Sequence, residues 1–572
     1  EARGKDPQSQ AHAVEEVAVP VFEKLCQERV PAATSAKAQP LAEAKVEDGT
    51  EQWPPDVLDT SPQGCARLGG LTLPPCQEIG GSQGTGGSSS SVSSPPAVRG
   101  TPLVTKLLDP SLLRGVSLAT LLGGMGAHLR VVNLAATSFT EAESARMYAT
   151  SRQVDRLHRF ISHTWADSRV GKLLALSLSE NQLGTIAAST LVAFVLLVLR
   201  CQGLLPGVRI PHGAYGGEYE HAPYCLFSGT ITMFIALFYW HYIPSAVGCK
   251  KVYFLDKLCV HQTDGRLKLP GILSIAAFIA KADKLILLWT PRYFTRLWCM
   301  LEIAALVKVH DTQRLPLVFL PLQLANISFC AYIVLAASQV LYEINRLSGS
   351  VLPMFSIVLG LMGVGTFPLT VCLRAYARER KALREQLSVF SAEELECFSR
   401  RDRQLVFGSL IQWFGSLELF NDYVRSNLQR KILAALGSEV VFPLSYHAPL
   451  LLLFIFKEMD FIASGYWAQV PEDRILQEAC MSIGWAPVLL TYMPVGLRLA
   501  NLAAKKYEPR WKDHAMSAIV SALNLIYGVL AYAVANVFLP MCPSYIIVPG
   551  LVLLWLWALW LELGAVVGAR CL

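Results

Sequence analysis

The sequence predicts an α/β domain built on a parallel sheet, joined to a helical region that crosses a membrane several times. The chain of 572 residues is 53% hydrophobic and only 16% charged, with a mean hydropathy of +0.38, whereas soluble domains carry about 25% charged residues. Several uncharged runs reach the length that crosses a bilayer, about 20 residues. Around the first two runs, short apolar strands alternate with amphipathic helices, which is the pattern of a parallel sheet covered by helices.

Residues 1–100 are predicted to be a disordered tail. They are rich in Pro, Gly, Ser, Ala and Gln, show no hydrophobic periodicity and end near GGSQGTGGSSSSVSSPP. Such a segment cannot bury enough apolar surface to offset the entropy that ordering costs. Residues 101–153 are more apolar but are interrupted by charges. They are predicted to be a helical lead-in that lies on the membrane surface or packs on the domain.

Uncharged runs divide the rest of the chain into predicted membrane hairpins. The first hairpin occupies 181–248, the second 325–374, and four further transmembrane helices lie within 439–569. The eight candidate spans are 181–199, 222–240, 326–342, 352–373, 440–456, 479–497, 515–539 and 546–567. The last two share one uncharged tract, which Pro540, Pro543 and Pro549 divide at a predicted reversal.

Lys and Arg are concentrated in alternate loops. The loop 203–221 has Arg209 against Glu218 and Glu220 and is poor in basic residues. Basic residues gather after the fourth and sixth spans, at Arg374, Arg378, Arg380, Lys381, Arg384, Arg400, Arg401, Arg403, Lys505, Lys506, Arg510 and Lys512. By the positive-inside rule, both termini and the larger polar segments face the cytosol. Residues 375–438 are then a basic cytosolic helical segment, which lies on anionic headgroups or packs on the α/β domain.

The first hairpin leaves and returns to one side, so the segments 154–180 and 249–324 are predicted to form one split cytosolic domain. Asp167 and Ser168 are credible starters for the first helix. Pro270 stands where the first turn of a later helix tolerates proline. The predicted strands lie in HRFISH, KKVYFL, KLILLWT and RLPLVFLPL. Either the sheet has these four strands, or residues 375–438 complete it.

Four motifs in this domain resemble the TIR (Toll/interleukin-1 receptor) family, especially its plant-type branch. FISHTWADSR parallels the first box, F-L-S-F-R-G-x-D-T-R, and VYFLDK parallels the second strand, V-F-x-D-D. Pro270 and Gly271 match a Pro-Gly loop of animal members. LILLWTPRYFTRLWCMLEI parallels I-x-V-x-S-x-x-Y-x-x-S-x-W-C-x-x-E-L. The matching residues are Phe160, Ser162, Asp167, Arg169, Tyr293, Trp298, Cys299 and Glu302. The resemblance covers roughly a fifth of the chain and implies a flavodoxin-like parallel sheet.

The chain departs from the family at four places: the inserted hairpin, Trp165 in place of a glycine, Arg296 in place of a small residue, and the lack of a clear fifth strand after Leu322. The resemblance implies that Glu302 is the catalytic residue of an NAD+ nucleosidase, because a carboxylate stabilises the oxocarbenium-like centre that forms when an N-glycosidic bond breaks. It also implies a substrate-binding role for Trp165, Asp167, Arg169 and Trp298. The alternative reading makes these residues helix caps, surface charges and packing residues.

The resulting prediction is an integral membrane protein that acts in signalling or stress response through self-association of its TIR-like domain, with or without cleavage of NAD+. The alternatives are a non-catalytic TIR scaffold on a membrane anchor, and a transporter or channel regulated by the domain.

Expected partners are membrane lipid, a second copy of the chain and other TIR proteins. The absence of a concentrated basic face argues against nucleic acid, and no Cys/His spacing suggests a metal. NAD+ is expected only as a substrate, not as a cofactor. Cys201 and Cys225 flank one non-cytosolic loop and are the candidate disulfide.

Overall fold

A computed structural model of the full chain describes twelve stretches of the sequence. They are 106–107, 109–131, 139–211, 218–246, 248, 251–310, 315–347, 354–436, 443–467, 487–488, 490–533 and 556. All of them belong to one compact unit, Val98–Leu572, and the other unit is Glu1–Ala97. The predicted N-terminal tail and the last predicted span therefore lie outside the described residues, apart from Leu556.

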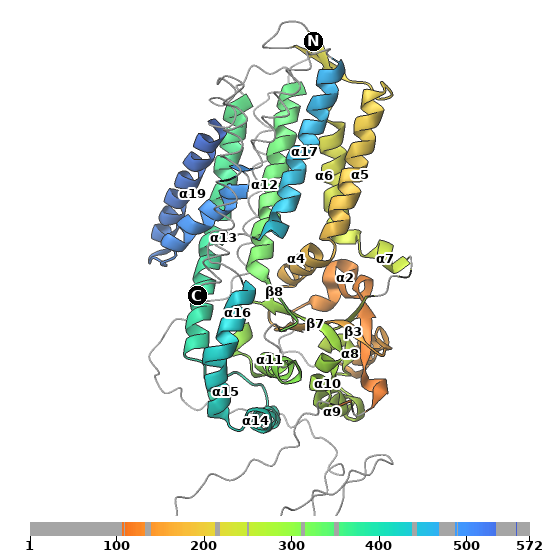
Figure 1. Cartoon of the computed structure of the whole chain (residues 1–572), viewed down its shortest axis with the longest axis vertical. Helices are drawn as coiled ribbons and strands as arrows, with labels where there is room; N and C mark the ends of the chain where they lie inside the picture. The colour runs from red at the N-terminus through yellow and green to blue at the C-terminus, as the bar shows by residue number, and fades with distance from the viewer. Residues whose placement is uncertain are drawn as a thin grey trace, which may run out of the picture. The chain divides into compact units, whose positions relative to one another are not determined.

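A six-stranded mixed sheet forms the centre of the α/β domain (Figure 1), in the order β2-β1-β6-β3-β7-β8. The strands are β1 (Arg114–Ser117), β2 (Arg152–Gln153), β3 (Leu157–His163), β6 (Val252–Phe254), β7 (Ala282–Trp289) and β8 (Leu317–Pro321). The four strands predicted from the sequence, β3, β6, β7 and β8, pair in parallel. Strand β6 is buried throughout and β7 almost throughout, as a sheet covered on both faces requires. In β8 only the last two residues are buried.

The order of the parallel strands is that of a doubly wound sheet. Numbered along the chain they run 2-1-3-4 across the sheet, the order found in flavodoxin-like folds. The order reverses between β3 and β7. Ligands of such sheets bind at this reversal, outside the carboxyl ends of the strands.

Strands β3 and β6 pair although a helical hairpin separates them in the chain. Arg159 lies opposite Tyr253 and Phe160 opposite Phe254. The two phenylalanine rings stack, with their centroids 4.6 Å apart. Segments 154–180 and 249–324 therefore contribute strands to one sheet.

The lead-in 101–153 differs from its prediction as a purely helical segment. It contains α2 (Leu118–Gly126) and α3 (Glu141–Ala149), but also β1, which pairs antiparallel with β6, and β2, which pairs antiparallel with β1. Gly115 allows this, because its bare Cα lies against the Val252 side chain. The sheet therefore grows at the β6 edge, and residues 375–438 add no strand among those described.

Five helices of the sequence 169–309 surround the parallel strands. They are α4 (Arg169–Glu180), α8 (Asp256–Cys259), α9 (Gly265–Leu273), α10 (Ile275–Ala280) and α11 (Leu297–Val309), the last preceded by the 3₁₀ turn η4 (Tyr293–Thr295). Ser168 caps α4 as predicted, since its hydroxyl accepts from the Gly171 amide. The expected first-turn position of Pro270 is wrong. Asp264 caps α9 and starts it earlier, which leaves Pro270 inside the helix.

Long apolar helices make up the rest of the described chain. They are α5 (Gln182–Cys201), α6 (Tyr224–Tyr239), α12 (Leu322–Leu347), α13 (Met354–Ser388), α17 (Leu444–Trp467) and α19 (Arg510–Ala533), and residues 490–502 are also helical. Among the described residues, three helices are long and apolar enough to cross a membrane: Gln182–Cys201, Leu322–Leu347 and Arg510–Ala531. The expected count of eight spans extends beyond what these three show.

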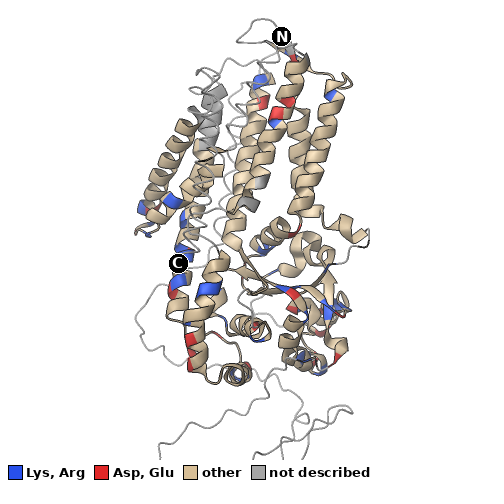
Figure 2. Cartoon of the chain, viewed as in Figure 1, with Lys and Arg blue, Asp and Glu red and all other residues tan. Residues whose placement is uncertain are grey.

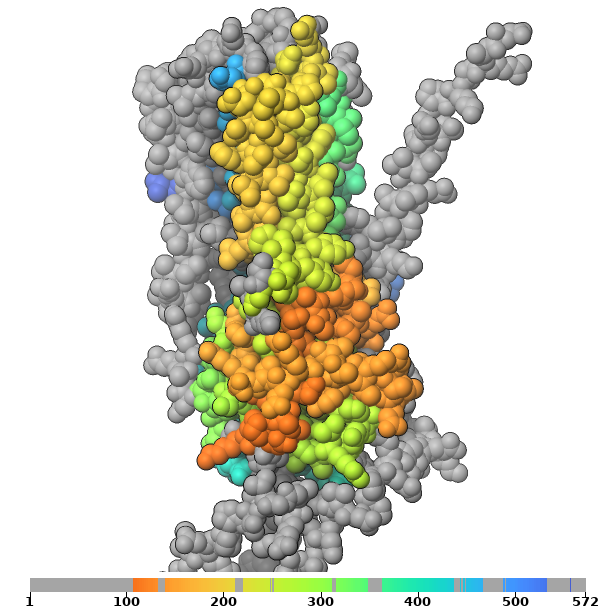
Figure 3. All heavy atoms as spheres, turned by 90° about the vertical axis from the view of Figure 1, so that its right-hand side faces the viewer, coloured from red at the N-terminus to blue at the C-terminus, as the bar shows by residue number. Residues whose placement is uncertain are grey.

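Helices α5 and α6 pack as a hairpin that exposes large apolar side chains. Figure 2 shows both helices without charge along most of their length, and Figure 3 shows them side by side on one face. The exposed side chains on these helices are Leu183, Leu191, Phe194, Val195, Val198, Ile231, Ile235 and Tyr239. A water-facing surface rarely carries so many contiguous apolar groups, so this face suits lipid.

The described part of the basic segment, residues 375–436, packs on the α/β domain. They comprise the end of α13, η5 (Ala392–Glu394), α14 (Arg400–Phe414), α15 (Leu417–Tyr423), the π-helical turn η6 (Val424–Leu428) and α16 (Gln429–Leu436). The backbone of Glu396 accepts from the Leu297 amide at 3.1 Å, and its carboxylate pairs with Arg296 at 3.1 Å. Of the two alternatives for this basic segment, the described contacts show packing.

We expect Gly115→Ala to destabilise the α/β domain, because the new methyl group would overlap the Val252 side chain and lie 3.2 Å from Leu157 Cδ2. Overpacking of this kind costs about 1–3 kcal/mol, which lowers Tm by about 2–10 °C in a domain of this size. Thermal unfolding of the detergent-solubilised chain measures the effect. Gly123→Ala is the matched control, since its nearest contact would be the Tyr242 hydroxyl at 3.7 Å. Equal Tm values for the two variants would contradict the close approach at β1.

Candidate functional site

Glu302 lies at the reversal of strand order. It belongs to the second turn of α11, and its carboxylate oxygen Oε2 accepts a hydrogen bond from the Ser162 hydroxyl. Ser162 is the penultimate residue of β3 and also bonds the hydroxyl of Tyr293, which follows β7. The carboxyl group is thus held between the carboxyl ends of β3 and β7, where a doubly wound sheet binds its ligands.

Local packing fixes α11 in this place. Tyr293 and Cys299 are buried. The Tyr293 hydroxyl lies 3.3 Å from the carbonyl oxygen of Cys299, and the Cys299 thiol lies 3.8 Å from the carbonyl oxygen of His163. These contacts join η4, α11 and the end of β3, so the direction of Glu302 is set by the helix and not by a flexible loop.

The surroundings of Glu302 favour its neutral form. Burial among neighbouring groups raises the pKa of Glu302 to about 8, against which the Ser162 hydrogen bond acts. The negative charge of Asp256 is a smaller contribution to the same rise in pKa. A carboxyl group with this pKa is mostly protonated at pH 7 and becomes an anion in mildly alkaline conditions or when water reaches it.

Trp165 and Asp256 meet at the end of β6. The Trp165 indole N–H donates to Asp256 Oδ2 at 2.5 Å, and the Lys257 ammonium lies 4.9 Å from the centroid of the indole ring. Lys257 also donates to the carbonyl oxygen of Arg130 at 2.7 Å. Burial raises the pKa of Asp256 and lowers that of Lys257 to about 8. The half-exposed Trp165 therefore lies over the buried Lys257 and the half-buried Asp256, two charges of opposite sign.

Asp167 lies at the end of β3, beside the next strand. The Thr290 hydroxyl, at the end of β7, contacts both Asp167 oxygens at 2.9 and 3.0 Å. Lys172 on α4 is completely buried and donates to the carbonyl oxygen of Thr164 at 2.7 Å. Burial and the charge of Lys257 lower the pKa of Lys172 to about 7. Two buried ammonium groups thus share this edge of the sheet with three carboxyl groups.

Two predicted substrate-binding residues, Arg169 and Trp298, make no polar contact with Glu302 among the described residues. Arg169 is the first residue of α4, is half-buried, and makes no hydrogen bond or ion pair among the described residues. The Trp298 indole N–H donates to Asp402 on α14 at 3.3 Å. Of the predicted set, the structure brings Glu302, Trp165 and Asp167 to one sheet edge and directs Trp298 to the 375–438 segment.

Sequence reasoning did not find Lys172 as a member of this edge. Lys172 interrupts the apolar helix VGKLLALSLS, and a lysine in a buried helix face was the available signal. A surface depression elsewhere in the described chain is lined by Glu141, Thr263, Asp264 and Arg266. Across the described residues, no group of three His, Cys, Asp or Glu side chains is arranged to hold a metal.

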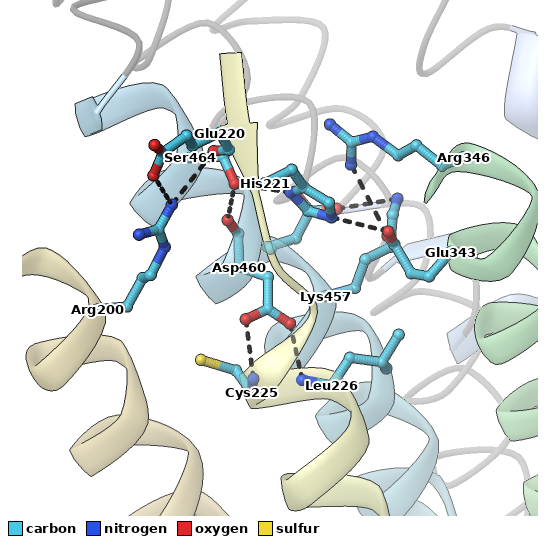
Figure 4. A network of polar contacts seen from close by, with 11 residues as sticks. Arg200, Glu220, His221, Cys225, Leu226, Glu343, Arg346, Lys457, Asp460 and Ser464 are labelled. Carbon is cyan, nitrogen blue, oxygen red and sulfur yellow. Dashed lines mark hydrogen bonds and ion pairs between the residues drawn. The ribbon is translucent and has the colours of Figure 1, made fainter. Parts of the chain in front are cut away.

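A second polar cluster joins α5, α6, α12 and α17 at the β4–β5 ribbon (Figure 4). Strands β4 (Val208–Pro211) and β5 (Glu218–His221) connect α5 to α6. The Asp460 carboxylate accepts from the amides of Cys225 and Leu226, each at 2.8 Å. Cys225 and Cys201 are both free thiols, so the candidate disulfide is not formed. The predicted fifth span ended at residue 456, which left Asp460 in a loop, whereas α17 continues to Trp467.

The chain was compared with protein-family models, with curated proteins and with solved structures, and no match was found in any of the three. The fold and the two polar clusters therefore rest on the residues of this chain alone.

Stability should fall as the pH rises from about 5 to about 8. An acid whose pKa is raised in the folded state holds its proton there and loses it on unfolding, so its contribution is lost as the pH rises through the folded pKa, here about 8. Glu302→Gln removes this titration and should stabilise the domain at pH 8 by about 1–3 kcal/mol. Tm at pH 5.5 and pH 8 measures the difference. The control Glu394→Gln changes an exposed carboxylate and should keep the wild-type pH dependence. An unchanged pH dependence in Glu302→Gln would place the titrating group elsewhere.

Proposed function

We propose that this chain is a multi-pass membrane protein whose cytosolic α/β domain is TIR-like, signals by self-association and cleaves NAD+. The observation that supports this most is the position of Glu302, whose carboxyl group lies between the ends of β3 and β7. The strand order, the positions of the motifs and the position of this carboxyl group all support the same proposal, and they support it more strongly together than singly.

The chemistry of the site suits glycosidic cleavage. Release of nicotinamide leaves an oxocarbenium-like ribose, which an adjacent carboxylate stabilises. Glu302 must be ionised for that role, so the reaction needs a state in which its pKa falls from about 8. Lys172 and Lys257 are the buried cations of this edge, and ammonium groups of this kind are suited to the pyrophosphate of the substrate.

Self-association supplies such a state. In the family that the motifs resemble, contact between domains completes the active site. Membrane anchoring raises the local concentration of the domains, which makes weak contacts between them effective. On this proposal, the isolated domain holds Glu302 mostly neutral at pH 7. Association admits substrate and lowers the pKa of the carboxyl group only in part, so the carboxylate still becomes more abundant as the pH rises.

One observation favours a second candidate, a non-catalytic TIR-like interaction module. Ser162 donates to Glu302 and also bonds Tyr293, so the carboxyl group already has internal partners. A glutamate held in this way can stabilise the packing of α11 on the sheet without taking part in a reaction. In that case the domain recruits other copies of itself, or other TIR proteins, without chemistry.

NAD+ cleavage should rise with pH and should depend on Glu302. Full-length protein at high density in proteoliposomes should release nicotinamide faster at pH 8.5 than at pH 6.5, because the carboxylate is the active form. Both Glu302→Ala and Glu302→Gln should lower the rate at least 100-fold, as expected for the loss of a charge-stabilising group. Glu394→Gln should leave it unchanged. Release of nicotinamide by Glu302→Ala at the wild-type rate would refute the assignment, and no release by any form would favour the interaction module.

The β4–β5 ribbon should lie on the side of the membrane opposite to the α/β domain. Gln202→Cys, next to this ribbon, and Lys284→Cys, in β7, both place a thiol at an exposed position. An impermeant maleimide applied to sealed vesicles should add label to one variant only, above the background of the native cysteines. Permeabilisation should make the other reactive. Equal labelling of both in intact vesicles would show that the first hairpin does not cross the bilayer.

A further inference from the structure

His221 is buried at one end of the α5–α6 hairpin, the end that is distant from α4. Helix α5 has 20 residues, about 30 Å of rise, and leads from the end of α4 to the β4–β5 ribbon. His221 is the last residue of β5 and is completely buried. Its ring lies between α12 and α17 and faces Glu343 on one side and Ser464 on the other (Figure 4).

Three short hydrogen bonds form a continuous chain through this ring. His221 Nε2 lies 2.8 Å from Glu343 Oε2. His221 Nδ1 lies 2.7 Å from the Ser464 hydroxyl oxygen. The Ser464 hydroxyl in turn donates to the carbonyl oxygen of Asp460 at 2.8 Å.

Each of these three hydrogen bonds needs one proton, and the protons that the residues supply can be counted. A serine hydroxyl has one proton, and here it is used toward Asp460. The Nδ1 atom of His221 must then donate to Ser464. Neutral histidine has only one N–H, so the bond at Nε2 needs one further proton, carried by the imidazole or by Glu343. All three bonds coexist only when the His221–Glu343 pair holds this extra proton.

Charged groups of the neighbouring elements surround the pair. Arg346 on α12 lies 3.8 Å from Glu343 Oε1, and its positive charge favours the carboxylate form of Glu343. Asp460 of α17 is occupied by the amides at the start of α6. The remaining charged groups of the cluster are the pair Arg200 and Glu220, 3.3 Å apart, and the pair Lys457 and Glu458, 3.4 Å apart.

We propose that the His221–Glu343 pair is a proton-binding site that latches the β4–β5 ribbon to α12 and α17. When the proton is lost, Ser464 has one hydroxyl proton for two acceptors, and either the bond to His221 or the bond to Asp460 breaks. The ligand is a proton from the compartment that the ribbon faces. Helix α12 continues from Glu343 back to Leu322, directly after β8, so the latch is built on the helix that leaves the sheet. This site does not depend on NAD+ cleavage.

Hydrogen exchange of the full chain in lipid nanodiscs at pH 6, 7 and 8 tests the proposal, with rates divided by the intrinsic rate at each pH. A proton that is bound in the closed state and released on opening makes protection fall as the pH rises above about 6.5, the pKa of free histidine, by up to tenfold per pH unit. The amides of residues 218–221 and of Cys225 and Leu226 should show this loss in wild type.

Three variants separate the latch from general effects of charge. His221→Gln removes the titrating ring, and its protection should not change with pH. Ser464→Ala removes the competition for one hydroxyl proton at little cost in volume, and the fall should shrink to less than half. Glu220→Gln alters a charge of the same ribbon and should behave as wild type. Protection in wild type that does not vary with pH, or a wild-type fall in Ser464→Ala, would overturn the proposal, and the serine variant decides if His221→Gln does not fold.

Discussion

The parallel pairing of β3 with β6 is the constraint on which the rest of the described structure depends. The two strands share a register, Arg159 with Tyr253 and Phe160 with Phe254, although α5 and α6 lie between them in the chain. Parallel strands need a long crossover, and here the crossover includes a helical hairpin. The chain must therefore return to the sheet that it left, so an even number of long helices separates α4 from β6. The sheet thereby dictates the topology of the first hairpin.

The position of the candidate site follows from the same pairing. With β6 and β7 on either side of β3, the carboxyl ends of three strands meet at one edge. The edge gathers Ser162 and Asp167 from the end of β3, Asp256 from β6 and Thr290 from β7. Because these groups are largely buried, their charges depend on one another, and a proton on Glu302 is the natural way to limit the negative charge. An edge of this kind is poised to change its protonation when water or a ligand enters.

Buried strands of the parallel sheet could be predicted from sequence, since their burial on both faces makes them short continuous apolar runs. The two antiparallel strands could not. Strand β1 has four residues and β2 has two, and both depend on pairing that local sequence does not encode. The length of α17 could not be predicted from local sequence either. Charges such as Lys457 and Asp460 at the end of an apolar run indicate a loop, but α17 continues through them to Trp467. It does so because Asp460 accepts from an amide of α6 and Lys457 pairs with Glu458 on its own helix.

Polar side chains at the ends of the apolar helices match the helix dipoles. Asp460 places a carboxylate on the first amides of α6, where the partial charge is positive. Arg374 is completely buried and donates to the carbonyl oxygens of Ala503 and Lys505, just beyond the helix 490–502, where the partial charge is negative. Each residue comes from a different helix than the one whose end it satisfies. A helix end in a nonpolar surrounding has unpaired amides or carbonyls that cost several kcal/mol each. Asp460 satisfies two such amides at the start of α6, and Arg374 satisfies two carbonyls just past the helix 490–502. These two helix ends are therefore stabilised by polar contacts between helices.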